Sequence, residues 1–74
     1  METAETKTIE VVVNGAARTI PAGLSIGHLL EWLKIDVSRV AVELNGQIVR
    51  QPEWPVAAVQ EGARIEVVWF VGGG

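Results

Sequence analysis

The sequence predicts an α+β fold in which one main helix packs on one face of a mixed β-sheet. Three observations favour this class. Two Asn-Gly dipeptides each separate a pair of short β-rich runs, one stretch repeats apolar residues at helical spacing, and a long apolar run stands near the end of the chain. The chain has 74 residues, so we expect one small domain.

Composition excludes several kinds of site. The chain has no cysteine, which rules out a disulfide, a thiolate metal site and a thiol nucleophile. This absence fits a reducing compartment, and we expect a cytoplasmic protein. The formal net charge of −3 argues against nucleic acid as a partner, because nucleic-acid-binding domains carry a basic stripe. No apolar run approaches the length of a membrane span, so no membrane partner is expected.

The first elements form a hairpin around Asn14-Gly15, a dipeptide that favours a type I′ turn because both central residues need a positive φ. We expect strands at residues 8–13 and 17–20, and a disordered N-terminal extension over the polar residues 1–7. One face of the first strand carries Ile9, Val11 and Val13, and the other carries Thr8, Glu10 and Val12.

A helix is expected over residues 26–34, because apolar residues recur there at helical spacing. Ser25 precedes this stripe and is a suitable N-cap. His28 projects from the opposite side of the helix and is interpreted as a solvated residue, since no cysteine or serine forms a recognisable motif with it. The single histidine and the scattered carboxylates also lack metal-ligand spacing.

A second hairpin pairs residues 40–44 with residues 47–50 around Asn45-Gly46. Residues 51–62 are interpreted as irregular, with one short helical turn, and the final strand is expected within residues 63–71. The resulting order, β-β-α-β-β-β, indicates a β-grasp arrangement in which the last strand lies parallel to the first. The domain is expected to span residues 8–71.

On the last strand, Glu66 marks the solvent-facing side. Val68 and Phe70 share that side and are predicted to be exposed apolar residues, with Val12 of the first strand extending the patch. Exposed apolar patches often mark partner sites, so we expect a partner to dock there. The opposite side carries Ile65, Val67, Trp69 and Val71. Structural roles are expected for three tryptophans: Trp69 fills the edge of the core, Trp32 caps the core, and Trp54 pins the irregular segment to the body.

Three stretches resemble the thiamine-biosynthesis sulfur carrier family of ubiquitin-like β-grasp proteins: "VNGAARTIPAG…SIGHLLEWL", "VAVELNGQIVRQPEW" and "EGARIEVVWFVGGG". The resemblance covers residues 8–74 and includes the terminal glycines. One departure follows the second hairpin, where the family often carries Pro then Arg after the hairpin valine; here Arg50 and Gln51 follow Val49 and proline is delayed to Pro52.

The resemblance implies a cosubstrate and not an enzyme. A ubiquitin-activating-type enzyme, using ATP and Mg²⁺, would adenylate the Gly74 carboxylate, and sulfur from a cysteine desulfurase would convert it into a thiocarboxylate for thiazole synthase. The chain itself would bind no cofactor.

The residue types of the tail, residues 72–74, fit that scheme. A carboxylate becomes a good electrophile only when its oxygen belongs to a phosphate leaving group. Gly72, Gly73 and Gly74 have no Cβ to obstruct a narrow channel. In extended form they would reach roughly 10 Å beyond the sheet.

Four alternatives remain open at this stage. The chain could carry sulfur for another pathway, such as molybdopterin, or be a ubiquitin-like modifier conjugated to lysines. A plain binding module with an incidental tail is a third, and an enzyme is the weakest because no acid, base or nucleophile constellation is present.

Overall fold

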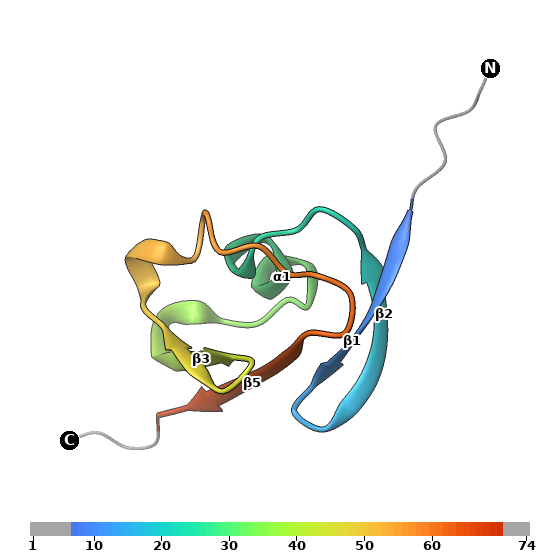
Figure 1. Cartoon of the computed structure of the whole chain (residues 1–74). Coiled ribbons are helices and arrows are strands. Elements are labelled where there is room, and N and C mark those ends of the chain that lie inside the picture. The colour runs from blue at the N-terminus through green and yellow to red at the C-terminus, as the bar shows by residue number, and fades with distance from the viewer. Residues whose placement is uncertain (1–6, 71–74) are drawn as a thin grey trace.

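The computed structural model describes residues 7–70, which form a five-stranded mixed sheet with one helix on one face (Figure 1). The elements in chain order are β1 (Thr8–Val13), β2 (Ala16–Pro21), α1 (Ile26–Trp32), the 3₁₀ turn η1 (Val37–Arg39), β3 (Val40–Leu44), β4 (Gln47–Val49), the 3₁₀ turn η2 (Gln51–Glu53) and β5 (Arg64–Trp69). The predictions for residues 1–6 and 71–74 lie outside the described residues.

The order of strands across the sheet is β2-β1-β5-β3-β4, so the last strand lies in the centre. β5 runs parallel to β1 and antiparallel to β3. These pairings confirm the β-grasp arrangement and the predicted α+β class. Within residues 7–70, no helix is long and apolar enough to cross a membrane.

Both hairpins turn at their Asn-Gly dipeptides. Asn14 and Asn45 have φ values of 50° and 53°, and the glycine that follows each has φ above 80°. A type I′ turn requires this pair of positive φ values, which explains why these dipeptides predicted the hairpins. β2 is longer than expected, since it begins at Ala16 and ends at Pro21.

The same two asparagines bind the central strand through their side chains. Asn14 Oδ1 accepts a hydrogen bond of 2.7 Å from the backbone N–H of Val67. Asn45 Oδ1 accepts one of 2.9 Å from the backbone N–H of Arg64. Each turn therefore supplies an acceptor to β5, from opposite sides of that strand.

The core lies between α1 and the sheet face that it covers. Ile26, Leu29 and Leu30 of the helix are fully buried, and they form one cluster with the inward residues of the strands: Val11, Val13, Ile20, Val40, Val42, Val49, Ile65 and Val67. The alternation predicted for β1, β3 and the first part of β5 is confirmed. Ser25 caps the helix as predicted, because its Oγ accepts from the N–H of His28; His28 itself is exposed.

The helix ends earlier than expected, at Trp32. Lys34 adopts a left-handed conformation with φ of 61°, and its N–H donates to the carbonyl of Glu31. Ile35 then donates its N–H to the carbonyl of Leu30. This is a Schellman motif, a helix terminator whose left-handed position is usually occupied by glycine.

The three tryptophans differ in how deeply they are buried. Trp54 is buried, and its Nε1–H donates to the Val49 carbonyl at 2.9 Å, so the prediction that it pins the irregular segment is confirmed. Trp32 and Trp69 are 46% and 48% exposed, so their predicted core roles are wrong. Trp32 lies at the end of the helix outside its buried stripe. Trp69 lies beyond the last residue that β1 pairs with, Ile65, so no strand flanks it on that side among the described residues.

We predict that Trp54→Phe lowers the free energy of unfolding by about 1–3 kcal/mol, because the Val49 carbonyl loses its donor in a buried position. Urea denaturation measures the change. The control is Trp32→Phe at a half-exposed position, for which we expect a change within about 0.5 kcal/mol. Equal effects of the two substitutions would contradict the role given to the Trp54 hydrogen bond.

We also predict that Asn14→Gly destabilises the fold by about 1 kcal/mol, since glycine keeps the positive φ but removes the acceptor of the Val67 N–H. Asn14→Ala should cost about 2 kcal/mol, because it adds the strain of a left-handed alanine. Asn14→Asp retains an acceptor and serves as the control. A Gly variant as stable as the wild type would show that the side-chain hydrogen bond contributes nothing.

Candidate functional site

The end of β5 determines where the glycine tail begins. The Phe70 N–H donates to the Arg39 carbonyl at 2.8 Å, so pairing with the β3 side of the sheet continues to the last described residue. The predicted reacting residues, Gly73 and Gly74, and the predicted partner-binding residue Gly72 lie outside the described residues. The candidate site that can be described is therefore the surface around the end of β5.

An exposed apolar patch lies on the sheet face opposite the helix. Val68 and Phe70 are 51% and 60% exposed, as predicted for outward positions of the last strand. Ala41 of β3 pairs directly with Val68 and shares this face. We call Ala41, Val68 and Phe70 the terminal patch, because it adjoins the point where the chain leaves the sheet.

The structure does not join Val12 to the terminal patch. Val12 faces outward but is only partly exposed, and it pairs with Arg64, four residues before Val68 on β5. At about 3.3 Å per residue, this separation is roughly 13 Å along the strand. Glu66 lies between them on the same face. The prediction that Val12 extends the patch is therefore not supported by the register.

Charged residues border the terminal patch on two sides. Glu43 of β3 pairs directly with Glu66 of β5, which places two carboxylates side by side behind Val68. At the other end, the backbone hydrogen bond from Phe70 places Arg39 across from it. Glu43 and Glu66 therefore border the patch on the side nearer the start of β5, and Arg39 borders it at the end of β5.

Arg39 lies in the short turn η1, which immediately precedes β3 and is capped by Asp36. The backbone N–H and the hydroxyl of Ser38 donate to the Asp36 carboxylate at 3.0 and 2.8 Å. These bonds, the backbone one foremost, hold the pKa of Asp36 below its usual value, and the charge of Arg39 acts in the same direction. The turn therefore fixes the entry to β3 beside the end of β5.

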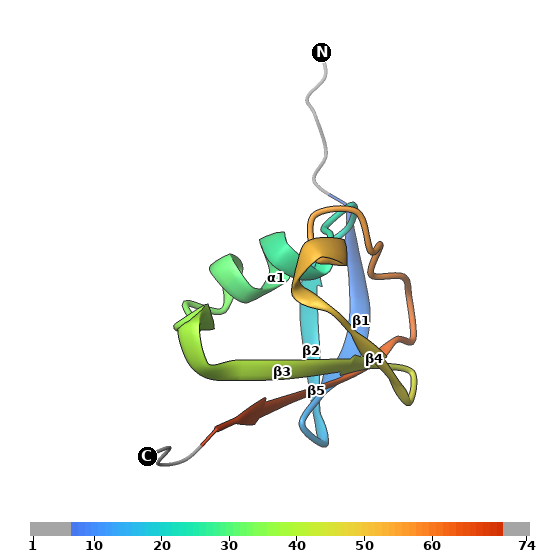
Figure 2. The same cartoon turned by 90° about the vertical axis from the view of Figure 1, so that its left-hand side faces the viewer.

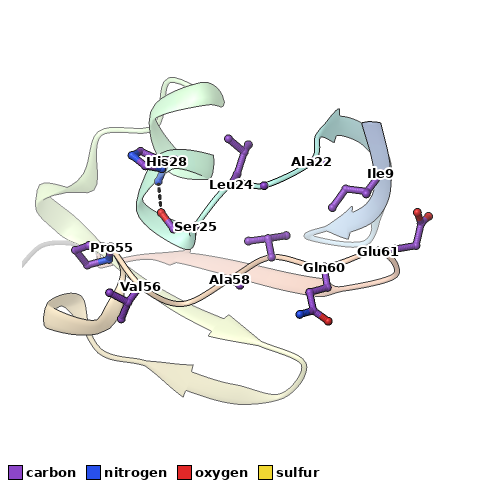
Figure 3. A pocket seen from close by; sticks show the side chains of 12 residues that line it. Ile9, Ala22, Leu24, Ser25, His28, Pro55, Val56, Ala58, Gln60 and Glu61 are labelled. Atoms are coloured by element: carbon purple, nitrogen blue, oxygen red, sulfur yellow. Dashed lines mark hydrogen bonds between the residues drawn. The ribbon is translucent and has the colours of Figure 1, made fainter. Parts of the chain in front are cut away.

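A hollow of about 560 Å³ lies elsewhere, between the start of α1 and residues 55–61 (Figure 3). Two of its polar side chains have structural partners: the Ser25 hydroxyl caps the helix, and the Glu61 carboxylate accepts from the Glu10 N–H at 3.2 Å. Among residues 7–70, no group of three or more His, Asp or Glu side chains is placed to hold a metal ion. This hollow shows no catalytic constellation.

The pattern that defines the ThiS family matches residues 11–74, which is almost the whole chain and includes the terminal glycines. The chain belongs to the ThiS family. This result confirms the resemblance seen in the sequence.

Solved and curated relatives agree with this assignment. The crystal structure of a ThiS thiamine biosynthesis protein from Geobacter metallireducens superimposes with a TM-score of 0.78 at 32% identity, covering 89% of this chain and all of that one. Sulfur carrier protein ThiS of Escherichia coli is 30% identical over 89% of this chain and its own full length. A thiazole synthase of Paramagnetospirillum magneticum is 38% identical over 89% of this chain, which spans only 20% of that longer protein.

Two members of the outer face were not singled out from the sequence. Ala41 pairs with Val68, and exposed Ile48 of β4 pairs with Glu43. The position of Ile48 could have been predicted from the Asn45-Gly46 turn, because a two-residue loop places residue 48 opposite residue 43. The position of Ala41 beside Val68 depends on the register between β3 and β5, which no local sequence pattern predicts.

Proposed function

We propose that this ThiS family member is a sulfur carrier, and that its Gly74 carboxylate is adenylated and then converted into a thiocarboxylate that supplies sulfur for the thiazole of thiamine. The observation that carries the proposal is the family match through residue 74, together with the E. coli relative named as a sulfur carrier. In this proposal the chain is a cosubstrate, and the adenylating partner supplies ATP and Mg²⁺.

The chemistry follows from the reactivity of a carboxylate. An oxygen of Gly74 attacks the α-phosphate of ATP, which releases pyrophosphate and leaves an acyl adenylate. The terminal sulfur of a persulfide then displaces AMP, and a second thiol cleaves the resulting acyl disulfide to leave the thiocarboxylate. The chain has no cysteine, so both sulfur groups must come from partners, with a cysteine desulfurase as the ultimate source of sulfur.

The terminal patch supports a docking role for the folded body. Val68 and Phe70 expose apolar side chains directly before the tail, where a partner that encloses the tail must approach. Burial of such side chains at the centre of an interface typically dominates its affinity. The body would thus serve as the recognition element, while the tail carries the reacting group.

Thiazole synthase is the proposed recipient of the sulfur. Two thiazole synthases, from Paramagnetospirillum magneticum and Magnetococcus marinus, contain a segment similar to 89% of this chain. The match spans only 20% of the length of each, so each is about five times as long as that segment. A carrier domain joined to a synthase in one chain favours a direct transfer between the two. A cytoplasmic location stays a prediction from the cysteine-free composition.

We predict that deleting Gly74, or the substitution Gly73→Trp, abolishes ATP–pyrophosphate exchange by the cognate adenylating enzyme. The deletion displaces the carboxylate, and the indole obstructs a channel shaped for a chain without Cβ atoms. Urea denaturation should show the same stability as the wild type, within about 0.5 kcal/mol.

The control for this experiment is deletion of Glu2, which shortens the other end of the chain by one residue and should leave exchange intact. Undiminished exchange by either tail variant would refute the assignment of Gly74. Exchange followed by attachment of the chain to lysines would instead identify a protein modifier. A molybdopterin carrier would be activated equally, but would fail to support thiazole formation by thiazole synthase.

For the terminal patch, we predict that Phe70→Ala weakens binding to the adenylating enzyme by about tenfold or more while stability changes by less than about 0.5 kcal/mol. Titration calorimetry measures the affinity. The control is Val56→Ala, an exposed apolar residue on the segment between η2 and β5. If the two variants bind equally well, the patch is not the docking site.

A further inference from the structure

β5 extends well beyond the hairpin that flanks it. Its register with β1 ends at the pair Val13 and Ile65, whereas its register with β3 continues to the pair Val40 and Trp69. Figure 2 shows the second half of β5 running past the tip of the β1–β2 hairpin toward the C-terminus. Among the described residues, Glu66 to Trp69 therefore have a strand on one side only.

Asn14 ends the pairing on the open side. Its N–H donates to the Ile65 carbonyl at 2.9 Å, and its Oδ1 accepts from the Val67 N–H. Backbone groups of a strand alternate between its two neighbours. The next groups on this side are therefore the carbonyl of Val67 and the N–H of Trp69, and no described strand lies beside them.

A hollow of about 310 Å³ adjoins this open edge on the helix side of the sheet. Apolar side chains of Val13, Ala16, Leu33 and Ile35 line it around the half-exposed ring of Trp69. Arg18 also lines it, and it is the charged member of that lining in the described part of the chain. We call it the Trp69 hollow. It lies on the opposite face of the sheet from the terminal patch.

We propose that the adenylating partner adds an extended segment to the open edge of β5, with a bulky apolar side chain in the Trp69 hollow and an acidic side chain beside Arg18. The inference rests on the proposed function, because it identifies how the activating partner recognises the carrier. Both side chains point to the helix side, so an even number of positions separates them along the added segment. Backbone hydrogen bonds to the Val67 carbonyl and the Trp69 N–H would fix the register of the added segment against β5.

This geometry explains two features of the surface together. Nearly half of Trp69 is exposed, and tryptophans are frequent anchors at interface centres. Arg18 is exposed on β2 and faces the same side as Val11, with which it pairs. An added strand would cover the ring, complement the arginine and hold the last residues before the tail in extended form.

The first test is amide hydrogen exchange measured by NMR on the full chain, free and bound to the cognate adenylating enzyme. We expect the Trp69 amide to exchange about tenfold or more slowly in the complex, because it gains a backbone acceptor. A Trp69 amide that exchanges equally fast in a complex competent for ATP–pyrophosphate exchange would overturn the inference and leave the proposed function intact. A wild-type chain that the enzyme never adenylates would overturn the proposed function itself.

The second test compares matched variants by titration calorimetry with the same enzyme. Trp69→Ala should weaken binding about tenfold or more, whereas Trp32→Ala, at an equally exposed tryptophan, should change affinity less than twofold. Arg18→Glu should weaken binding more than Lys7→Glu, which makes the same change of charge immediately before β1. Urea denaturation establishes that each variant is folded. Equal affinities within both pairs would refute the added strand.

Discussion

The whole sheet depends on how its last strand is held between two hairpins. β5 has no hairpin partner of its own, and its backbone N–H groups at Arg64 and Val67 donate to the side chains of Asn45 and Asn14. These asparagines also occupy the left-handed positions of the two turns. At each turn, one asparagine therefore both adopts the required left-handed conformation and accepts a hydrogen bond from β5. This links each turn to the central strand.

This arrangement has a functional consequence at the end of the chain. Asn14 stops the β1 side of the pairing at Val67, while β3 supports the strand as far as Trp69 and Arg39 of η1 binds the next residue, Phe70. The last strand is thus firmly held at its beginning and accessible at its end, on both faces and along one edge. The surfaces proposed for partner recognition are those that this asymmetric support leaves uncovered.

Local patterns predicted the elements well, because each carries its own physical signal. The Asn-Gly dipeptides marked both turns, and alternation separated buried Val67 from exposed Val68. Predictions failed where the answer depended on non-local register. Whether Trp69 is covered depends on where β1 ends beside β5, and the same register separates Val12 from Val68. The helix end was missed because Lys34 takes a left-handed position that glycine usually fills.

The central claim is that the terminal carboxylate of this chain is the group that carries sulfur. Tandem mass spectrometry of the wild-type chain, after incubation with its adenylating enzyme, ATP, Mg²⁺ and a persulfide donor, tests it most directly. The account predicts that one oxygen is replaced by sulfur and that fragmentation places this sulfur on Gly74, with no change when ATP is omitted. Sulfur on any other residue, or an unchanged Gly74 with a competent enzyme, would contradict it.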